Sequence, residues 1–387
     1  FTAPDTIFGN QRQGCRTFEI ADDRHKTAYI ANRMEGGEHA NHPFWVPEFR
    51  PVAWGSTDAM AEAVGYLDTL GLAAPRIGVE PSFLPMNAAQ ALNDGVPGAV
   101  LGDATGVMER LRAVKTPEEL ALMKRASERI TEAMQATIAA AREGSTKAEI
   151  IERLRQEETA RGLMFEYCLL TLGASHNRAS SDQAWRPGEV LSIDSGGNLD
   201  GYIGDICRMG VLGEPDAELE DLLGEVELVQ QAAFSRIRAG AKGGELIARG
   251  QEVLATQPNA GCTDFFAHGM GVITHEAPFL MTNHPVTYEG IDADVPLKAG
   301  MVLSVETTML HPARGFIKLE EDSANELYVW PYFYGMPLDA LTPAQRVEMY
   351  RLLTHGDYED MKMFGAYVFY RLGITPQGRW QFFVAGD

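Results

Sequence analysis

Four β-like segments in the second half of the chain carry an acidic residue or a histidine within or next to a run of apolar side chains. These residues are Asp194, Asp205, His268, Glu306 and Glu320. A carboxylate inside an apolar strand is costly to bury unless it is paired or bound to a metal. The pattern therefore requires a fold that either gathers these groups or leaves their strands at a water-facing edge.

The two aspartates are joined by a glycine-rich stretch. Asp194 ends the apolar run Glu189–Ile193, and Asp205 lies in the next β-like run, Tyr202–Arg208. A hairpin of this size can bring both carboxylates to one end of a sheet. Turn glycines beside an aspartate also suit a plain hairpin. This segment alone leaves metal binding and simple turn chemistry open.

Two histidines lie seven residues apart in Ala267-His268-Gly-Met-Gly-Val-Ile-Thr-His275-Glu. The glycines allow the backbone to turn closely around a ligand. Two unrelated surface histidines would give the same spacing. The remaining acids are Glu306, which closes the run Met301–Val305, and Glu320, which follows Gly315-Phe-Ile-Lys-Leu.

Taken together, the segments supply four carboxylates and one imidazole. This set is too rich in carboxylates for a structural zinc cluster. Four carboxylates gathered without cations would repel one another strongly, whereas two divalent ions would neutralise them. The combined pattern favours a centre for hard divalent metal ions.

The order and context of these motifs resemble the pita-bread metallohydrolases, the superfamily of aminopeptidase P, prolidase, creatinase and methionine aminopeptidase. The matching stretches are Asp194-x-Gly196…Gly201-Tyr202-x-x-Asp205-x-x-Arg208, His268-Gly-x-Gly…His275-Glu276, Gly300-Met…Glu306 and Lys318-Leu-Glu320. The resemblance covers about residues 113 to 330. It implies an α+β fold, in which a pita-bread catalytic domain follows a smaller α/β N-terminal domain.

The resemblance also implies a ligand for each position of a dinuclear centre. Asp194 would bind one ion, Asp205 and Glu320 would bridge both, and His268 and Glu306 would bind the second. We expect manganese first, with cobalt, iron or zinc as other candidates, because oxygen-rich sites favour hard ions. In such a site a hydroxide that bridges the metals attacks the substrate.

Two further roles follow from the same resemblance. Glu306 would carry a proton from the attacking water toward the leaving nitrogen. His275 would hydrogen-bond the scissile amide or the developing oxyanion. His176 lies near the position of a substrate-contacting histidine in the family, about one residue out of register, and a surface loop is the alternative.

Departures from the family pattern concern substrate recognition. Asp264 and Ala267 stand where proline-specific members usually have histidine and glycine, and Asp264 would favour a cationic substrate group. Lys318 replaces an arginine, which keeps the charge but loses the bidentate fork. We therefore expect an Xaa-Pro aminopeptidase or dipeptidase. The alternatives are an amidohydrolase for a small C–N compound and a catalytically silent binding protein.

Sequence signals for the starts and ends of helices indicate where the domains of the chain begin and end. Thr116-Pro117-Glu118-Glu119 is a strong helix start and predicts a helix to Ala141, with the domain boundary just before it. The expected domains are 1–113, 114–336 and a C-terminal extension, 337–387, that packs on the catalytic domain. Other expected helices cover residues 56–70, 83–92, 146–161, 217–239 and 244–255.

The net charge and the cysteine content indicate which binding partners and which cellular compartment to expect. The formal net charge of −21 disfavours a polyanion or an anionic membrane surface as a partner. No apolar run approaches the roughly 18 to 20 residues of a membrane span, and no secretory leader is seen. The four cysteines are widely spaced, which favours a reducing, cytoplasmic setting. The resemblance implies a homodimer.

Overall fold

The computed structural model describes residues 18–20, 27–43, 46–72, 74–280, 292–324 and 383–385. Two compact units divide between Leu111 and Arg112. The chain combines helices and sheets in blocks, which confirms the predicted α+β class. The expected extension 337–387, with a helix start at Thr342, lies outside the described residues except for strand β13 (Phe383–Ala385).

The first unit is a small α/β structure. One sheet has the order β1-β2-β3, and β4 and β5 form a second, parallel pair. Helix α2 buries Ala59, Met60 and Ala63 in the core of this unit. The elements are β1 (Phe18–Ile20), β2 (Ala28–Asn32), η1 (Arg33–Glu35), α1 (Gly36–Asn41), β3 (Glu48–Ala53), α2 (Ser56–Thr69), β4 (Arg76–Val79), α3 (Met86–Gly95), β5 (Val100–Asp103) and α4 (Thr105–Arg112).

The second unit is built on an eight-stranded sheet. Its order is β10-β9-β11-β12-β8-β7-β6, and β13 pairs in parallel with β8. The elements are α5 (Pro117–Ala140), α6 (Lys147–Ala160), β6 (Met164–Leu172), β7 (Val190–Leu199), β8 (Tyr202–Leu212), α7 (Ala217–Phe234), α8 (Gly243–Leu254), η2 (Ala260–Cys262), β9 (Thr263–Gly269), β10 (Glu276–Phe279), β11 (Val302–His311) and β12 (Gly315–Ala324).

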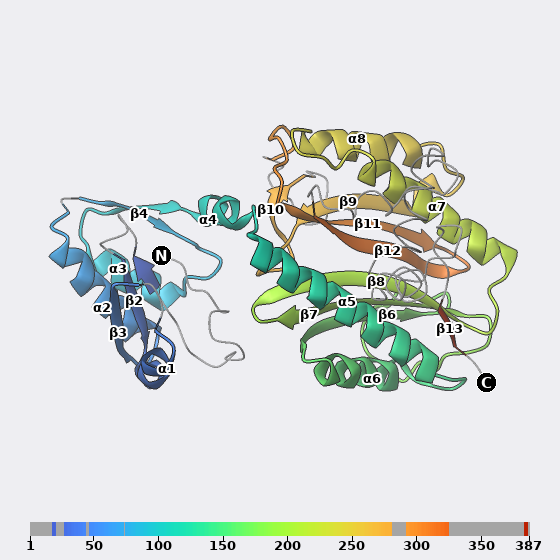
Figure 1. Ribbon diagram of the computed structural model, residues 1–387, viewed down its shortest axis with the longest axis horizontal. Coiled ribbons are helices and arrows are strands. Elements are labelled where there is room, and N and C mark those ends of the chain that lie inside the picture. Colours follow the sequence, from blue (N-terminus) through green and yellow to red (C-terminus); the bar gives the residue numbers. More distant parts are fainter. Residues whose placement is uncertain are drawn as a thin grey trace, which may run out of the picture. The chain divides into compact units, whose positions relative to one another are not determined.

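Two pairs of helices cover the two halves of this sheet. Helices α5 and α6 pack on β6, β7 and β8, whereas α7 and α8 pack on β9, β11 and β12 (Figure 1). Side chains alternate between the faces of a strand, so Ile193 and Val305 face these helices. Their chain neighbours Asp194 and Glu306 therefore point to the opposite face of the sheet, where the candidate site lies.

Several predicted helices are present with shifted ends. Helix α5 begins with a capping box in which the Glu119 backbone N–H donates to Thr116 Oγ1 at 3.3 Å. Helix α3 begins at Met86 rather than residue 83, because Pro85 disfavours helical backbone at the residue before it. Helix α7 ends at Phe234 rather than residue 239, and the chain then turns toward Gly240, which has a positive φ.

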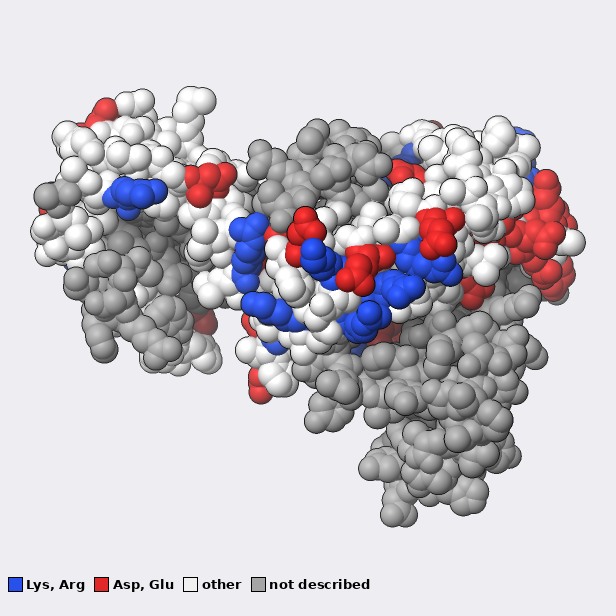
Figure 2. Space-filling view, turned by 90° about the horizontal axis from the view of Figure 1, so that it is seen from above, with Lys and Arg blue, Asp and Glu red and all other residues white. Residues whose placement is uncertain are grey.

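The described surface carries charges of both signs, and three cysteines are free thiols. On the described part of the face drawn in Figure 2, Lys and Arg side chains lie among Asp and Glu side chains. Within the described residues, no helix combines the length and apolar character needed to cross a membrane. Cys168, Cys207 and Cys262 are free thiols.

Candidate metal centre

The β7–β8 hairpin places both predicted aspartates on one face. Its turn residues Asp200 and Gly201 both have positive φ, at 52° and 94°, as a tight hairpin turn requires. Asp194 pairs with Cys207, and Gly196 pairs with Asp205. The two carboxylates therefore lie two cross-strand rows apart, which places them on the same side of the sheet.

A glycine next to the site makes room for a tyrosine. A Cβ on Gly196 would lie 2.3 Å from a ring carbon of Tyr167. Because that Cβ is missing, the ring lies over the strand and its hydroxyl donates to Asp205 Oδ1. Tyr167 thereby holds the orientation of this carboxylate.

The other half of the sheet supplies the histidine and the two glutamates. On β11, Glu306 pairs with Glu320 of β12, and Ser304 pairs with His268 of β9. The hydroxyl of Ser304 donates to Glu320 Oε1 at 2.9 Å. Strand pairing alone thus brings together His268, Glu306 and Glu320, which are up to 52 residues apart in the sequence.

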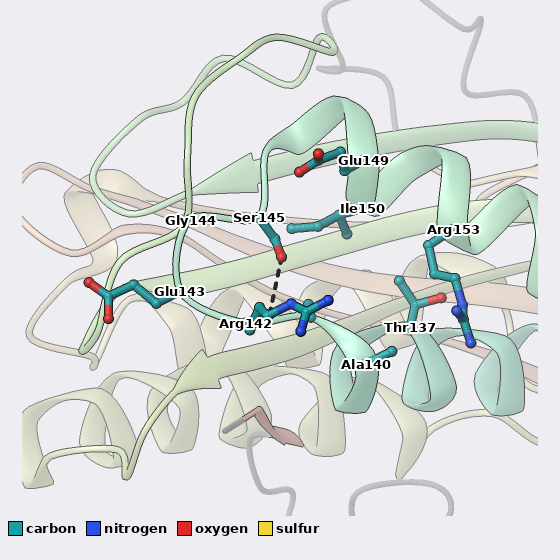
Figure 3. A pocket seen from close by; sticks show the side chains of 10 residues that line it. Thr137, Ala140, Arg142, Glu143, Gly144, Ser145, Glu149, Ile150 and Arg153 are labelled. Atoms are coloured by element: carbon teal, nitrogen blue, oxygen red, sulfur yellow. Dashed lines mark hydrogen bonds between the residues drawn. The ribbon is translucent and has the colours of Figure 1, made fainter. Parts of the chain in front are cut away.

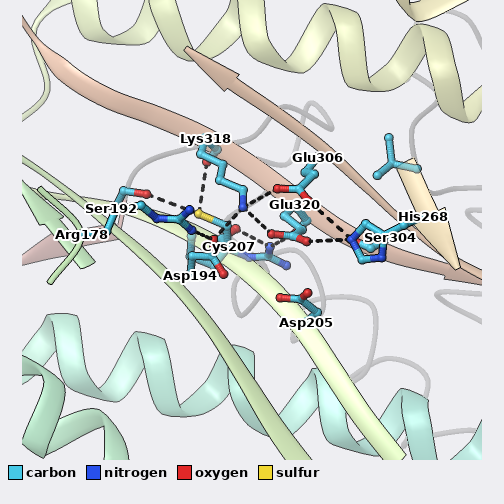
Figure 4. Close-up of polar contacts among 12 residues, drawn as sticks. Arg178, Ser192, Asp194, Asp205, Cys207, His268, Ser304, Glu306, Lys318 and Glu320 are labelled. Atoms are coloured by element: carbon cyan, nitrogen blue, oxygen red, sulfur yellow. Dashed lines mark hydrogen bonds and ion pairs between the residues drawn. The ribbon is translucent and has the colours of Figure 1, made fainter. Parts of the chain in front are cut away.

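All five predicted ligands meet in one buried cluster (Figure 4). Their ligand atoms form two triads within 4.8 Å, His268–Glu306–Glu320 and Asp194–Asp205–Glu320, which share Glu320. The five residues are between 1% and 5% exposed. Buried His268 Nε2 has no hydrogen-bond partner among the described residues and lies 3.4 Å from Glu306 Oε1. A buried ring nitrogen that makes no hydrogen bond and faces two carboxylates fits a divalent ion.

The predicted catalytic histidine lies on this cluster. The ring of His275 stacks on His268 with centroids 3.8 Å apart and an interplanar angle of 14°. Neither Gly269 nor Gly271 has room for a side chain. A Cβ on Gly269 would meet the Ala277 carbonyl oxygen at 2.2 Å, and one on Gly271 would meet Glu276 Oε1 at 2.4 Å. The glycines therefore allow the His275 segment to fold back onto the strand that carries His268.

A buried ion pair anchors the residue after His275. Glu276 is fully buried, and its Oε1 lies 2.9 Å from Lys115 Nζ, while its Oε2 lies 2.8 Å from Arg112 Nε. Burial lowers the pKa of Lys115, although Glu276 opposes this shift. The segment just before helix α5 thus fixes the start of β10.

Lys318 lies inside the ligand cluster. Its Nζ is 2.7 Å from Asp194 Oδ2, 2.5 Å from Glu306 Oε2 and 2.7 Å from Glu320 Oε2. Arg178 also contacts Asp194 Oδ2, from a side chain that is 37% exposed. We expected Lys318 to contact substrate. In the structure its ammonium contacts three of the predicted ligands.

The cluster shifts the pKa values of its own members. Burial raises the pKa of Asp205 well above its usual range, and Glu320 and Asp194 add to this effect. Burial alone would lower the pKa of His268, but its ion pairs with Glu306 and Glu320 raise it well above the usual value. These contacts favour the protonated form of His268, with which a metal ion bound at this nitrogen must compete.

Two predicted substrate residues lie away from the five ligands. His176 is exposed, and its Nε2 lies 3.4 Å from the His311 carbonyl oxygen. Asp264 is exposed on β9, on the same face as His268 but with Phe266 between them. The structure does not bring either residue into the ligand cluster.

A separate pocket lies at the loop between α5 and α6 (Figure 3). Its volume is about 390 Å³, and it is lined by Thr137, residues 140–145, Glu149, Ile150 and Arg153. The Arg142 backbone N–H donates to Ser145 Oγ at 3.1 Å beside it. None of the predicted site residues lines this pocket, so it is distinct from the metal centre.

Sequence reasoning missed several residues around the centre. Tyr167, Arg178 and the Glu276–Lys115 pair were not singled out. Strand periodicity could have found one of them, because Tyr167 lies on the same face of β6 as Leu169, the partner of Asp194. The other contacts depend on loop and linker packing that no local pattern encodes.

Comparison with family models gives two matches along the chain. Residues 121–324 match the model of metallopeptidase family M24, and residues 17–114 match the creatinase/prolidase N-terminal domain. Two curated relatives are named as dipeptidases. The probable dipeptidase PepE of Mycobacterium tuberculosis is 27% identical over 66% of this chain and 68% of its own length. The Xaa-Pro dipeptidase of Lactobacillus delbrueckii subsp. lactis is 25% identical over 63% and 66%.

Solved structures share the fold. A prolidase from Thermococcus sibiricus superposes with a TM-score of 0.70 at 19% identity, over 83% of this chain and 86% of that one. An Xaa-Pro dipeptidase from Bacillus anthracis gives a TM-score of 0.68 at 21% identity, over 82% and 86%. These likenesses establish the predicted pita-bread architecture.

Proposed function

The chain belongs to metallopeptidase family M24 and is a metallohydrolase, and from this premise we propose that it is a dinuclear Xaa-Pro dipeptidase or aminopeptidase. The observation that carries the proposal is the buried set of two triads sharing Glu320. Asp194 would hold one ion, His268 and Glu306 would hold the other, and Asp205 and Glu320 would be shared by both. A homodimer stays a prediction from the resemblance.

Divalent ions, manganese first among them, would supply Lewis acidity and lower the pKa of a water molecule toward neutrality. The protein's own groups then have defined tasks. Burial would raise the pKa of Glu306, but Lys318 and His268 lower it overall. Glu306 is therefore ionised at neutral pH and can accept a proton before passing it to the leaving nitrogen.

His275 would support the same reaction from its position against His268. Its ring is held by stacking on His268, and the Glu276 ion pairs fix the next residue. A histidine held in this way can hydrogen-bond the substrate carbonyl oxygen as negative charge develops on it. We propose that His275 positions and polarises the scissile amide.

The substrate assignment rests on the relatives that carry the name Xaa-Pro dipeptidase. One observation favours a second candidate, an amidohydrolase for a small C–N compound. Asp264 is exposed on the strand face that carries His268, and a carboxylate there would attract a cationic substrate group. His176 and Lys318 stay proposals for substrate contact.

A peptide panel separates these candidates. Manganese-loaded protein is incubated with Xaa-Pro dipeptides and tripeptides, matched Xaa-Ala peptides and small cationic amides, and products are identified by mass spectrometry. We expect release of the N-terminal residue from Xaa-Pro substrates only. Glu306→Ala serves as the control for contaminating peptidases. Cleavage of the small amides without peptide cleavage would contradict the proposal and favour the amidohydrolase.

A further inference from the structure

Helix α6 buries a glutamate against the outer face of the sheet, opposite the metal centre. The side chain of Glu158 is fully buried. Among the described residues, its polar partner is the hydroxyl of Ser195 on β7, 2.9 Å from Oε1, and Oε2 has no hydrogen-bond partner. A Cβ on Gly197 would lie 3.3 Å from this Oε2, and the same Cβ would meet Ile130 at 3.0 Å and Leu163 at 3.1 Å. The carboxyl group therefore ends among apolar side chains.

Within the described part of the chain, no cation forms an ion pair with Glu158. Burial raises the pKa of Glu158 to about 8, and its hydrogen bond with Ser195 opposes this shift. The thiol of Cys168 lies on the same face of β6, and burial raises its pKa well above the usual value, which keeps it neutral. The cations of α5 and α6 on this side have other neighbours: Arg161 pairs with Glu132 and Glu157, Lys147 donates to the Asn177 carbonyl, and Arg129 extends toward Gly162.

The hydroxyl of Ser195 has two neighbouring oxygens and one proton. Its Oγ lies 2.6 Å from the backbone carbonyl oxygen of Tyr167 and 2.9 Å from Glu158 Oε1. A carbonyl oxygen only accepts hydrogen bonds. The shorter contact takes the hydroxyl proton, so the proton of the second bond must come from Glu158. A neutral Glu158 satisfies both contacts, whereas an ionised one would leave a charged oxygen buried without a partner.

The carbonyl that Ser195 contacts belongs to a bulge that directs Tyr167 to the metal centre. The pairing of β6 with β7 skips Glu166, between Phe165 and Tyr167. Residues two apart share a face in a regular strand. Here Phe165 packs in the core beneath α5 and α6, whereas the Tyr167 hydroxyl donates to Asp205 on the other face. The extra residue of a bulge re-aims a side chain in this way.

We propose that Glu158 is a positioning residue that works as a neutral carboxylic acid. It donates to Ser195, Ser195 donates to the Tyr167 carbonyl, and this chain of bonds holds the bulge that keeps the Tyr167 hydroxyl on Asp205. When Glu158 loses its proton, the Ser195 hydroxyl turns to the carboxylate and the bulge loses its side-chain bond. This inference rests on the proposed function, because Asp205 is one of the ligands that the two ions of that centre would share.

Infrared difference spectroscopy tests the protonation state. The spectrum of the Mn²⁺-loaded natural protein minus that of Glu158→Gln should show a carboxylic acid band at neutral pH, and this band should fade as the pH rises through about 8. Glu152→Gln is the matched control, because Glu152 lies on the same helix with a side chain that is 48% exposed. Its difference spectrum should show an ionised carboxylate alone. Absence of the acid band for Glu158 would overturn the proposal.

Mn²⁺ affinity, measured by isothermal titration calorimetry, tests the positioning of Asp205. Ser195→Ala removes the bond to the bulge at every pH and should weaken Mn²⁺ binding at neutral pH by about tenfold, as the loss of a group that orients a metal ligand does. Glu158→Gln cannot ionise and keeps an N–H for Ser195. Above a pH of about 8, where the natural protein loses its acid, this variant should therefore bind Mn²⁺ about tenfold more tightly than the natural protein.

Comparison at equal pH removes the effect of protons that the ligands themselves release. Equal affinities of Glu158→Gln and the natural protein across the pH range would overturn the positioning role. If Glu158→Gln fails to fold, Ser195→Ala decides alone. Its deficit in Mn²⁺ affinity should shrink as the pH rises through about 8, because the natural protein then loses the same bond, and a deficit of constant size would contradict the proposal.

The infrared band and the Mn²⁺ affinity need no substrate, so their outcomes are separate from the proposed function. Both results as expected, without any Xaa-Pro cleavage, would support the role of Glu158 and overturn the substrate assignment. Xaa-Pro cleavage by a protein whose Mn²⁺ affinity is the same in Ser195→Ala and Glu158→Gln would overturn the role of Glu158 and leave the peptidase assignment standing.

Discussion

The buried ion pair next to His275, the proposed catalytic histidine, allows a quantitative prediction. Glu276 is fully buried, Lys115 is 5% exposed, and their charged atoms lie 2.9 Å apart. Among the described residues, replacing Lys115 with Met leaves the Glu276 carboxylate paired only with Arg112, whose side chain is 25% exposed. Breaking a buried ion pair by removing one partner costs about 3–5 kcal/mol. We expect Lys115→Met to lower the free energy of unfolding by an amount in this range.

A second substitution tests the cause. Glu276→Gln removes the buried charge while keeping a side chain of similar shape. Added to Lys115→Met, it should recover about 2 kcal/mol or more, because the uncompensated carboxylate is gone. Lys124→Met is the matched control. Lys124 is exposed and lies 3.8 Å from Glu128, so its loss should cost less than about 0.5 kcal/mol.

Urea unfolding followed by circular dichroism supplies the free energies, from the midpoints and slopes of the transition. Lys115→Met should also reduce kcat. His275 immediately precedes Glu276 in the chain, so loss of the Lys115–Glu276 ion pair would loosen the position of His275. The reasoning is refuted if Lys115→Met costs less than about 1 kcal/mol, or if Glu276→Gln makes that variant still less stable.

Three further predictions concern the centre itself. Glu306→Ala should abolish turnover and leave the circular dichroism spectrum unchanged, and residual activity near the natural level would contradict its role in proton transfer. Metal binding should release protons from His268 and Asp205, because the pKa of each lies well above its usual value in the metal-free protein. Affinity should therefore fall as the pH is lowered, and a binding enthalpy that does not depend on the ionisation enthalpy of the buffer would contradict this. Asp264→His should shift kcat/KM from cationic toward neutral substrates, and an unmoved substrate profile would remove Asp264 from recognition.

Much of the fold was accessible from local patterns. The capping sequence at Thr116 predicted helix α5 to within a residue at either end, because side-chain caps and Pro117 act locally. In the second unit the runs 189–193, 202–208 and 301–305 were identified as strands but judged too short, and β6, β9 and β10 were not predicted. Strand β7 runs on to Leu199, beyond the apolar run that identified it, because the inner face of the sheet carries polar residues. In the first unit, β2 and β3 were missed altogether.

In the candidate site too, residues on strands could be predicted and contacts made by loops could not. The predicted ligands come together because each lies on a strand whose register is set by its own apolar face. Alternation also could have placed Lys318 in the centre, since it lies two residues before Glu320 and so shares its face. The sequence could not locate Arg178 or Lys115 beside their partners, because these contacts depend on how loops and the linker pack.

Anomalous diffraction from crystals of the protein grown with excess Mn²⁺ tests the central claim most directly. The account predicts two manganese peaks enclosed by Asp194, Asp205, His268, Glu306 and Glu320, with Glu320 in contact with both. Peaks confined to other parts of the molecule, with these carboxylates still held by Lys318, would contradict it.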